Sequence, residues 1–466
     1  MEVLFYIAGD VSNYNVITYK YSNQSEKTFF AAHALYKIFK PEKVVALLPD
    51  SLISSGDKLD PGQLKDAYTQ LIKERASKLN YNQEEIDAFL RNLEAYVIPN
   101  TGIGSAIKAN GSNLEKSKDD KYARVPYSSN FSPVFIFNVI YSIFRKYRDD
   151  GYDIILDLTH GTNVLTSISL TVASMFNAKV FAAPVMGSPG QQQEVNIVEL
   201  TGVIEAMKDS IMTEESIKKV DERYFRDYSD KLKEIRPDKM PEISDILGKI
   251  KSHDPGRIKN FLAELRNGFP VNAVKELKEL EDEMTNFENR VMTLKDAYEK
   301  WYSYSKLSEF TSILLSNFYS ALTVKSLISR IKASNDLDSL RNIIDLYAEV
   351  KYYDKFLSLA REYPIAYCLK INGGGKFEDT EDKTKESTLY GKCEERVNET
   401  ITKKISDLIK YRNFIMHSGL SIDAKTQIDG NGNIKQSSQD VSLSNIEKSI
   451  EKIRKELNSI IQSMNG

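Results

Sequence analysis

The feature that most constrains the fold is an alternation of strand and helix patterns through the first two hundred residues. Continuous apolar runs at residues 3–8 (VLFYIA) and 43–48 (KVVALL) are typical of strands buried on both faces of a sheet. Strands that alternate with helices imply right-handed crossovers, so we expect a Rossmann-like domain with a mostly parallel sheet over residues 1–206. Further strands are expected at 95–98, 153–158, 179–182 and 195–198, and helices at 25–40 (capped by Ser25), 132–147 and 164–176.

No strand pattern is sustained beyond about Met207. Residues 212–287 are charged and helical in pattern, with interruptions at Pro237, Pro241, Pro255 and Pro270. From about Arg290 onward we expect long amphipathic helices, separated by polar loops at 372–375 and 429–432. The expected fold class is α/β plus all-α, with domains at 1–206, a helical linker or insertion at 207–289 and a helical domain at 290–466.

Composition narrows the classes of function. The chain of 466 residues carries 63 Lys and Arg against 66 Asp and Glu, so its net charge is −3. This balance excludes a globally basic nucleic-acid binder, and any RNA contact must be local. Four histidines and two cysteines supply few ligands for a transition-metal site. Cys368 and Cys393 lack the spacing of a redox motif and are expected to be ordinary structural residues.

Two features bear on location. The first residues, MEVLF, carry an acid where a signal peptide needs basic residues. The most apolar long stretch, 165–186, is interrupted by polar side chains and does not resemble a bilayer span. We therefore expect a soluble, cytoplasmic protein without membrane contact.

A group of small polar residues follows the strand expected at 153–158, at the point where a helix begins. Backbone N–H groups at a helix N-terminus favour phosphate, and Gly161 permits close approach of a ligand. The loop after the first strand would open at the same edge of the sheet, where open α/β sheets bind ligands. The candidate binding residues are Gly9, Asp10, Ser12 and Asn13 in the first loop and Thr159, His160, Gly161, Thr162 and Asn163 in the second.

Simpler alternatives exist for these loops. Thr162 or Asn163 could serve only as a helix cap, with His160 an ordinary loop residue. No GxGxxG follows the first strand and no P-loop occurs in the sequence, which argues against a dinucleotide redox cofactor and a P-loop nucleoside triphosphatase. The glycine-bearing segment 101–105 could line the same pocket, although an ordinary turn is favoured.

Arg412, Asn413 and His417 form the second candidate site. Arg412 and Met416 continue an apolar helical stripe, which places a cation on or beside a buried face. Gly419 is typical of a residue just past a helix, so His417 would lie in the last turn, where the dipole favours imidazolium. The stripe consists of Ile401, Ile405, Leu408 and Ile409.

The angle between the two charged residues limits how they act together. Five residues turn an ideal helix by about 140°. Arg412 and His417 therefore reach one substrate only if Arg412 wraps round, the helix distorts or two copies combine. An Arg and a His at this spacing also arise easily by chance. Of the other histidines, His33 is expected to be packed in the first helix and His253 to lie in a surface turn.

Taken together, these motifs resemble those of a known family. Asp-Leu-Thr-His-Gly-Thr-Asn after the fourth strand of a Rossmann-like domain resembles a CARF domain, and Arg-x(4–6)-His in a helical domain resembles HEPN. Their order resembles the CARF–HEPN ancillary ribonucleases of type III CRISPR–Cas systems, in particular the Csx-type and Csm-six-like branch. Residues of about 207–290 carry no motif that matches firmly.

The resemblance implies a metal-independent endoribonuclease specific for single-stranded RNA. It would be activated by a cyclic oligoadenylate, with cyclic tetra-adenylate favoured, bound by the two candidate loops at the interface of a homodimer or a higher oligomer of dimers. His417 would serve as acid or base, Arg412 would hold phosphate oxygens, and Asn413 and Tyr411 would orient them. Because the 2′-hydroxyl of RNA is the nucleophile, no cofactor is needed for catalysis.

Two rival hypotheses come from other classes. The chain could be a ligand-responsive regulator whose region 212–287 contains a helix-turn-helix or scaffolding module, with no ribonuclease activity. It could also be an enzyme that cleaves the cyclic activator in the Rossmann-like domain itself.

Overall fold

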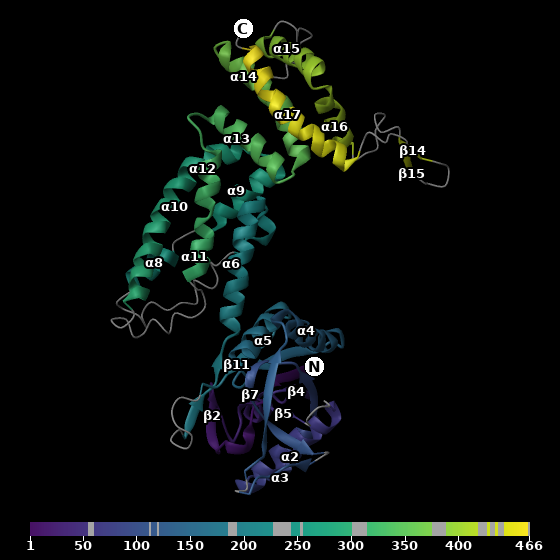
Figure 1. Cartoon of the computed structure of the whole chain (residues 1–466). Coiled ribbons are helices and arrows are strands. Elements are labelled where there is room, and N and C mark those ends of the chain that lie inside the picture. Colours follow the sequence, from purple (N-terminus) through teal and green to yellow (C-terminus); the bar gives the residue numbers. More distant parts are fainter. Residues whose placement is uncertain are drawn as a thin grey trace. The chain divides into compact units, whose positions relative to one another are not determined.

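The computed structural model (Figure 1) divides into two compact units, Met1–Glu205 and Ala206–Gly466, which we describe separately. The structure describes residues 1–54, 60–110, 113–118, 121–184, 193–226, 244–251, 255–300, 315–374, 388–417, 426–428, 434–436 and 442–464.

The first unit is built on a six-stranded sheet in the order β13-β11-β10-β1-β4-β6. All neighbouring strands in it are parallel except the short edge strand β13, which runs antiparallel to β11. The predicted Rossmann-like fold followed by a helical region is therefore confirmed. The strands are β1 (Glu2–Ile7), β4 (Lys43–Pro49), β6 (Leu93–Ile98), β10 (Asp153–Asp157), β11 (Lys179–Ala182) and β13 (Val198–Glu199).

Helices cover both faces of this sheet, which explains why its strands are apolar without alternation. Leu4 and Tyr6 of β1 pack into the core formed with α1, α2 and α3, whereas Val3, Phe5 and Ile7 pack into the core formed with α4 and α5. These helices are α1 (Ala31–Phe39), α2 (Pro61–Lys78), α3 (Gln83–Arg91), α4 (Pro133–Asp149) and α5 (Asn163–Met175).

Two small sheets correct the sequence-based expectations. The helix predicted from Ser25 begins only at Ala31, because Gln24–Thr28 forms β3 in a hairpin with β2 (Ile17–Tyr21). The expected turn at 101–105 is also wrong: it lies in β7 (Thr101–Asn110), which pairs with β9 (Arg124–Asn130). Glycine and serine in these strands mask the usual strand signal. The remaining short elements are β5 (Ile53–Ser54), β8 (Asn113–Leu114), β12 (Glu194–Asn196), which pairs with β2, and the 3₁₀ turn η1 (Val11–Asn13).

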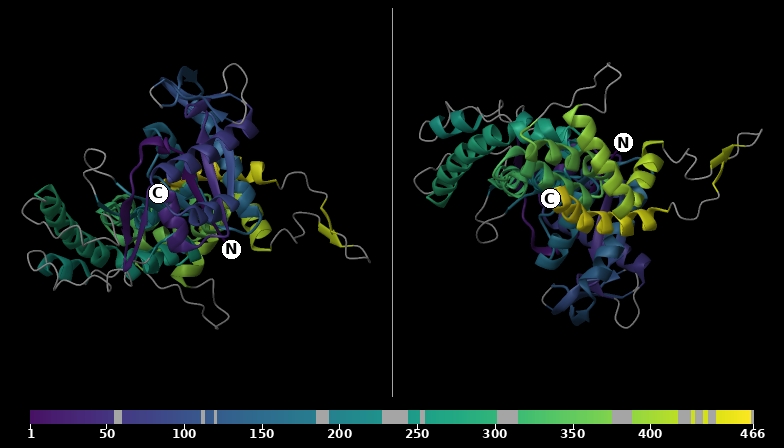
Figure 2. Two further views of the ribbon diagram at one scale, coloured as in Figure 1. Left: turned by 90° about the horizontal axis from the view of Figure 1, so that it is seen from below. Right: turned by 90° about the horizontal axis from the view of Figure 1, so that it is seen from above.

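The second unit is helical around one continuous core. Pro255 and Pro270 do not break helices but begin α9 and α10, where proline lacks only an N–H that would be free. The C-terminal helix α17 packs against α14 and α16. It is the yellow helix beside the label C in the right view of Figure 2. The helices are α6 (Thr201–Lys219), η2 (Glu222–Tyr224), α8 (Ser244–Lys251), α9 (Pro255–Asn267), α10 (Pro270–Glu299), α11 (Leu315–Leu322), α12 (Val324–Ile331), α13 (Asp336–Glu349), α14 (Tyr353–Ile371), α15 (Leu389–Lys404), α16 (Ser406–Met416) and α17 (Leu443–Met464).

One short hairpin, β14 (Thr426–Ile428) with β15 (Ile434–Gln436), departs from the all-helical expectation for this unit. Pro237, Pro241 and the loop expected at 429–432 lie outside the described residues. No helix in the described ranges is long and apolar enough to cross a membrane.

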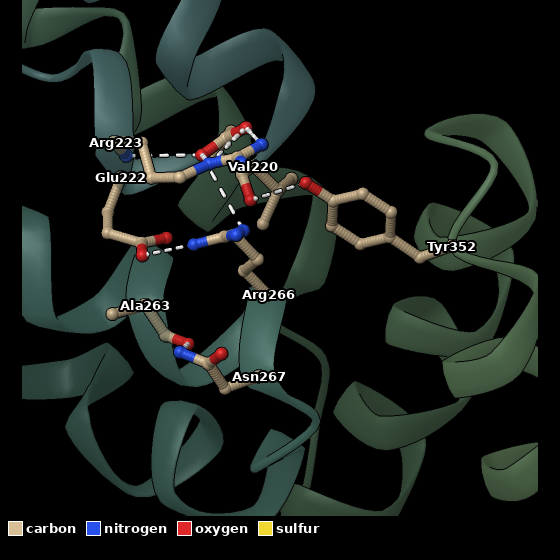
Figure 3. A network of polar contacts seen from close by, with 8 residues as sticks. Val220, Glu222, Arg223, Ala263, Arg266, Asn267 and Tyr352 are labelled. Carbon is tan, nitrogen blue, oxygen red and sulfur yellow. Dashed lines mark hydrogen bonds and ion pairs between the residues drawn. The ribbon is translucent and has the colours of Figure 1, made fainter.

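Polar contacts hold the corner at which the chain leaves α6 (Figure 3). Val220 has a φ of 54°, which is uncommon for a β-branched residue, and its carbonyl oxygen accepts from the Tyr352 hydroxyl at 3.2 Å. Asp221 accepts from the Arg223 backbone N–H at 3.1 Å and forms ion pairs with the guanidinium groups of Arg223 and Arg266. These contacts tie the end of α6 to α9 and to the start of α14.

Cys368 of α14 and Cys393 of α15 form a disulfide, which agrees with the expected structural role, although the sequence did not predict that they pair. They lie 25 residues apart, and only the packing of α14 against α15 brings their Cα atoms to 5.7 Å. Both side chains are buried in the core of the helical unit. The bond therefore closes a long loop and joins α14 to the helix that leads into α16.

Reduction of this disulfide should destabilise the helical unit. A cross-link over 25 residues contributes about 3 kcal/mol by restricting the unfolded chain. Calorimetric melting with and without reductant should show a lower Tm for the helical unit in the reduced protein. Cys393→Ser should have the same Tm with and without reductant. A wild-type Tm that is unchanged by the reductant would contradict the disulfide.

Candidate functional site

The two candidate loops meet because their strands are neighbours. β1 and β10 pair in parallel with Tyr6 opposite Asp157, so both strands end at the same edge of the sheet. Across this edge the Tyr14 hydroxyl and His160 Nδ1 lie 2.9 Å apart, and the two rings stack with centroids 4.8 Å apart. The contact joins segments 146 residues apart in the sequence.

Two glycines allow this close approach. A Cβ at Gly9 would lie 2.6 Å from the Tyr14 hydroxyl oxygen and 3.2 Å from His160 Cβ. Gly161 has a φ of 116°, and a Cβ there would lie 2.9 Å from Ile7. Both positions therefore require glycine for the loops to pack as they do.

Thr159 is committed to the fold of its own loop. Its N–H and its hydroxyl both donate to Asp157 Oδ1, at 2.9 and 2.5 Å, and its hydroxyl oxygen accepts from the Ala183 N–H at 2.9 Å. These bonds link the ends of β10 and β11. Thr159 therefore supports the loop, and its hydroxyl has little capacity left for a ligand.

Asp157 and His160 are both perturbed by burial. Burial raises the pKa of the Asp157 carboxyl to about 6, although the hydrogen bonds from Thr159 oppose the rise. Burial lowers the pKa of His160 to about 4, so its imidazole is neutral at pH 7. Asp157 Oδ2 and His160 Nε2 are both buried without a hydrogen-bond partner among the described residues.

Above these supports, Gly161, Thr162 and Asn163 are exposed where α5 begins. The Thr162 hydroxyl accepts from the Leu165 N–H at 3.4 Å, so Thr162 caps the helix as the simpler alternative supposed. Asn163 is the first residue of α5 and is exposed, as is Asn13 in the other loop. The first turn of α5 thus presents backbone N–H groups and a polar side chain to an anionic ligand.

Residues that the sequence analysis did not single out complete this edge. Asp10 accepts from the Ser12 N–H at 3.0 Å and forms an ion pair with Arg124 of β9. The Arg75 guanidinium of α2 donates to the Tyr14 carbonyl oxygen, through Nε at 2.6 Å. Arg75 and Arg124 come from segments outside both loops, so only the fold could have revealed them.

The second candidate site lies at the end of α16. Arg412 is half-buried, and its Nε is buried without a hydrogen-bond partner in the described ranges, which agrees with the expected position beside a buried face. Asn413 accepts, through its backbone carbonyl, from the N–H of His417 at 3.0 Å. His417 is exposed and follows the last residue of α16.

The helix that carries this site differs from the expected one in two ways. The helix is interrupted at Ile405, which has φ −142° and ψ 55°. The apolar stripe therefore belongs to two helices, α15 and α16. Met416 is 57% exposed, so it does not continue the buried stripe. Gly419 lies outside the described residues.

The remaining candidates have structural roles or are not described. His33 is buried in α1, and its Nδ1 lies 2.8 Å from the Thr28 hydroxyl, as expected for a packed residue. His253 lies outside the described residues. Within the part of the chain that the structure describes, no group of three or more His, Cys, Asp or Glu could hold a metal ion.

Comparison with known proteins bears on the first unit. Residues 3–196 match the family model described as "CRISPR system endoribonuclease Csx1, CARF domain". The match spans the parallel core of the sheet and both loops, so the first unit is similar to a CARF domain of that family. No curated protein matches the chain.

One similar solved structure is Enterococcus italicus Csm6 bound to cyclic hexa-2'-fluoro-hexa-dAMP. The alignment covers 100% of this chain and 94% of that chain, at 11% identity and a TM-score of 0.30.

Replacement of Asp157 by Asn should change how stability depends on pH. In the folded wild type, the pKa of Asp157 is about 6, against an ordinary value of 3.8 that applies when the chain is unfolded. The stability contributed by its protonated form is present below about pH 4 and is lost as pH rises through 6, by about 3 kcal/mol. Asp157→Asn keeps an acceptor for Thr159 but removes this titration.

The measurement is calorimetric unfolding of wild type and Asp157→Asn at pH 4 and pH 7. His33 and His160, whose lowered pKa values oppose the trend, cancel in the difference between the two proteins. We expect the variant to gain stability relative to wild type at pH 7. Asp153→Asn, at the exposed start of β10, serves as control. If the stability of Asp157→Asn changed with pH in the same way as that of the wild type, the raised pKa of Asp157 would be contradicted.

Proposed function

We propose that the chain is a CRISPR-associated endoribonuclease that cyclic tetra-adenylate activates by binding at the edge of the first unit. The observation that carries the proposal is the CARF match over residues 3–196, from a family described as an endoribonuclease, in a chain whose helical unit presents Arg412 and His417 at one helix end. The proposal also comprises a CARF domain at 1–206, a helical linker at 207–289 and a HEPN domain at 290–466, with the second boundary inside α10.

The first site suits an anionic ligand. The first turn of α5 supplies N–H groups and the positive end of the helix dipole. Arg124, which pairs with Asp10, is a cation that a phosphate could share. Asn13 and Asn163 are exposed, and each offers an amide donor and an acceptor to an adenine or a ribose.

The second site suits RNA cleavage without a metal. The 2′-hydroxyl attacks the adjacent phosphorus, so the protein must move protons and stabilise the added negative charge of the phosphorane. His417 is exposed and can take a proton from the 2′-hydroxyl or give one to the leaving 5′-oxygen. Arg412 holds phosphate oxygens with its planar fork, Asn413 helps to orient the substrate, and the product ends in a 2′,3′-cyclic phosphate.

Two copies of the chain would complete this catalytic site. Arg412 is half-buried and His417 follows the helix end, separated from it by an angle of about 140° in an ideal helix. Within one copy they diverge, whereas a two-fold dimer would place both pairs around one phosphate. The exposed Met416 between them is an apolar side chain that such an interface would cover.

The rival hypothesis of a DNA-binding regulator receives little support from α10. Its sequence carries more acidic than basic residues, and Arg257 of α9 forms ion pairs with Glu279 and Glu283 on it. Acidic side chains repel the phosphate backbone on which nucleic-acid affinity depends.

His417→Ala should abolish RNA cleavage and leave folding and activator binding intact. Loss of positioned proton transfer lowers the rate by roughly 10²–10⁴-fold. Arg412→Ala should also abolish RNA cleavage. Arg412→Lys should restore little of it, because Lys lacks the planar guanidinium fork. Cleavage rates at saturating activator are compared with melting and size-exclusion data on the same samples.

Lys403→Ala provides a matched control, since it removes an exposed cation from the neighbouring helix α15. It should cleave RNA as the wild type does. Wild-type cleavage by a correctly folded His417→Ala variant would exclude the catalytic assignment.

Asn163→Ala should weaken the response to activator without altering the catalytic site. The loss of one or two hydrogen bonds to the ligand should raise the half-maximal activator concentration about tenfold, with the same maximal rate and the same cleavage sites. Ser167→Ala, one turn further along α5, is the control. Equal half-maximal concentrations for wild type and Asn163→Ala would refute a ligand contact at this position.

A further inference from the structure

We propose that His160 acts in the activator site through Nδ1, as a positioning residue that Tyr14 holds, and not by a contact between Nε2 and the ligand. This inference rests on the proposed function, because it assigns a role within the same binding site. It also adds Tyr14, which lies outside the candidate binding residues, to the residues on which activation depends.

The first support is the geometry of the pair. The Tyr14 hydroxyl lies 2.9 Å from His160 Nδ1, and the rings stack at an interplanar angle of 25°. Stacking and hydrogen bond together fix both the plane of the imidazole and its rotation. Because Gly161, Thr162 and Asn163 follow His160 directly, anchoring this ring also restrains the backbone that leads into the exposed start of α5.

The second support is the burial of the other ring nitrogen. His160 Nε2 is inaccessible to solvent and has no hydrogen-bond partner among the described residues. A ligand approaching from solvent cannot reach it without displacing what covers it. Nδ1 already has its partner, so neither nitrogen is available at the surface.

Tyr14 is itself held from a third segment. Arg75 of α2 donates to the Tyr14 carbonyl oxygen from both Nε and Nη2, and Nη2 also donates to Asn15 Oδ1 at 3.2 Å. Gly9 leaves room for the pair, since a Cβ there would collide with the Tyr14 hydroxyl. Tyr14 is thus tied to α2 through its carbonyl oxygen and to the β10 loop through its hydroxyl group. Loss of the hydroxyl bond should loosen the β10 loop while the bond to α2 remains.

Amide substitutions distinguish the two nitrogens. The side-chain amide of Asn places a polar atom near the position of Nδ1, whereas the longer amide of Gln places one near the position of Nε2. If His160 acts through Nδ1, His160→Asn retains the bond to Tyr14 and His160→Gln does not. If His160 contacts the ligand through Nε2, the order is reversed.

The experiment measures binding of cyclic tetra-adenylate by calorimetry, and RNA cleavage against activator concentration, for the full chain. We expect His160→Asn to bind within about threefold of wild type. His160→Gln and Tyr14→Phe should each bind about tenfold more weakly, because a buried polar group loses its partner. Maximal cleavage rates at saturating activator should not change, which separates positioning of the loop from general damage to the fold.

Tyr21→Phe is the matched control, since it removes another tyrosine hydroxyl bond of the same unit, to Glu199 at 2.8 Å. It should bind the activator as wild type does. Better binding by His160→Gln than by His160→Asn, or equal binding by both, would overturn the inference, as would wild-type affinity in Tyr14→Phe. Failure of the wild type to bind cyclic tetra-adenylate at all would instead overturn the proposed function.

Discussion

The parallel pairing of β1 with β10 is the interaction on which the candidate binding site depends. It aligns Tyr6 with Asp157 and brings two loops, distant in sequence, to one edge of the sheet. Both strands are buried on both faces, so a shift in register would disturb two cores at once. The rigid sheet thereby places a glycine-lined contact between loops and an exposed helix N-terminus side by side.

Much of this arrangement could be predicted from the sequence. Apolar runs predicted the parallel strands. Because open α/β sheets bind ligands at the carboxyl ends of their strands, the sequence also predicted that residues 9–13 lie beside residues 159–163. The sequence could not show that the Thr159 hydroxyl is hydrogen-bonded to Asp157 and Ala183, or that His160 contacts Tyr14. Those roles depend on which side chains the fold brings together, and spacing along the chain does not encode them.

The same limit applies to the elements that were missed. β7 and β9 form a long antiparallel pair, yet glycine, serine and proline in them resemble loop composition. Cys368 and Cys393 meet only because α14 packs on α15. Disulfides are uncommon in reducing cytosol, so this bond does not favour the cytoplasmic location that we expected from the sequence. For the Arg412–His417 motif, sequence and structure agree on a helix end, whereas its chemistry remains a proposal.

We propose that a ligand bound to the first unit switches on RNA cleavage by the helical unit. The most direct test incubates the full chain with labelled single-stranded RNA in EDTA, with and without cyclic tetra-adenylate. We expect cleavage only with the activator, and products that end in a 2′,3′-cyclic phosphate. Intact RNA in both samples, or cleavage that requires a divalent metal ion, would contradict it.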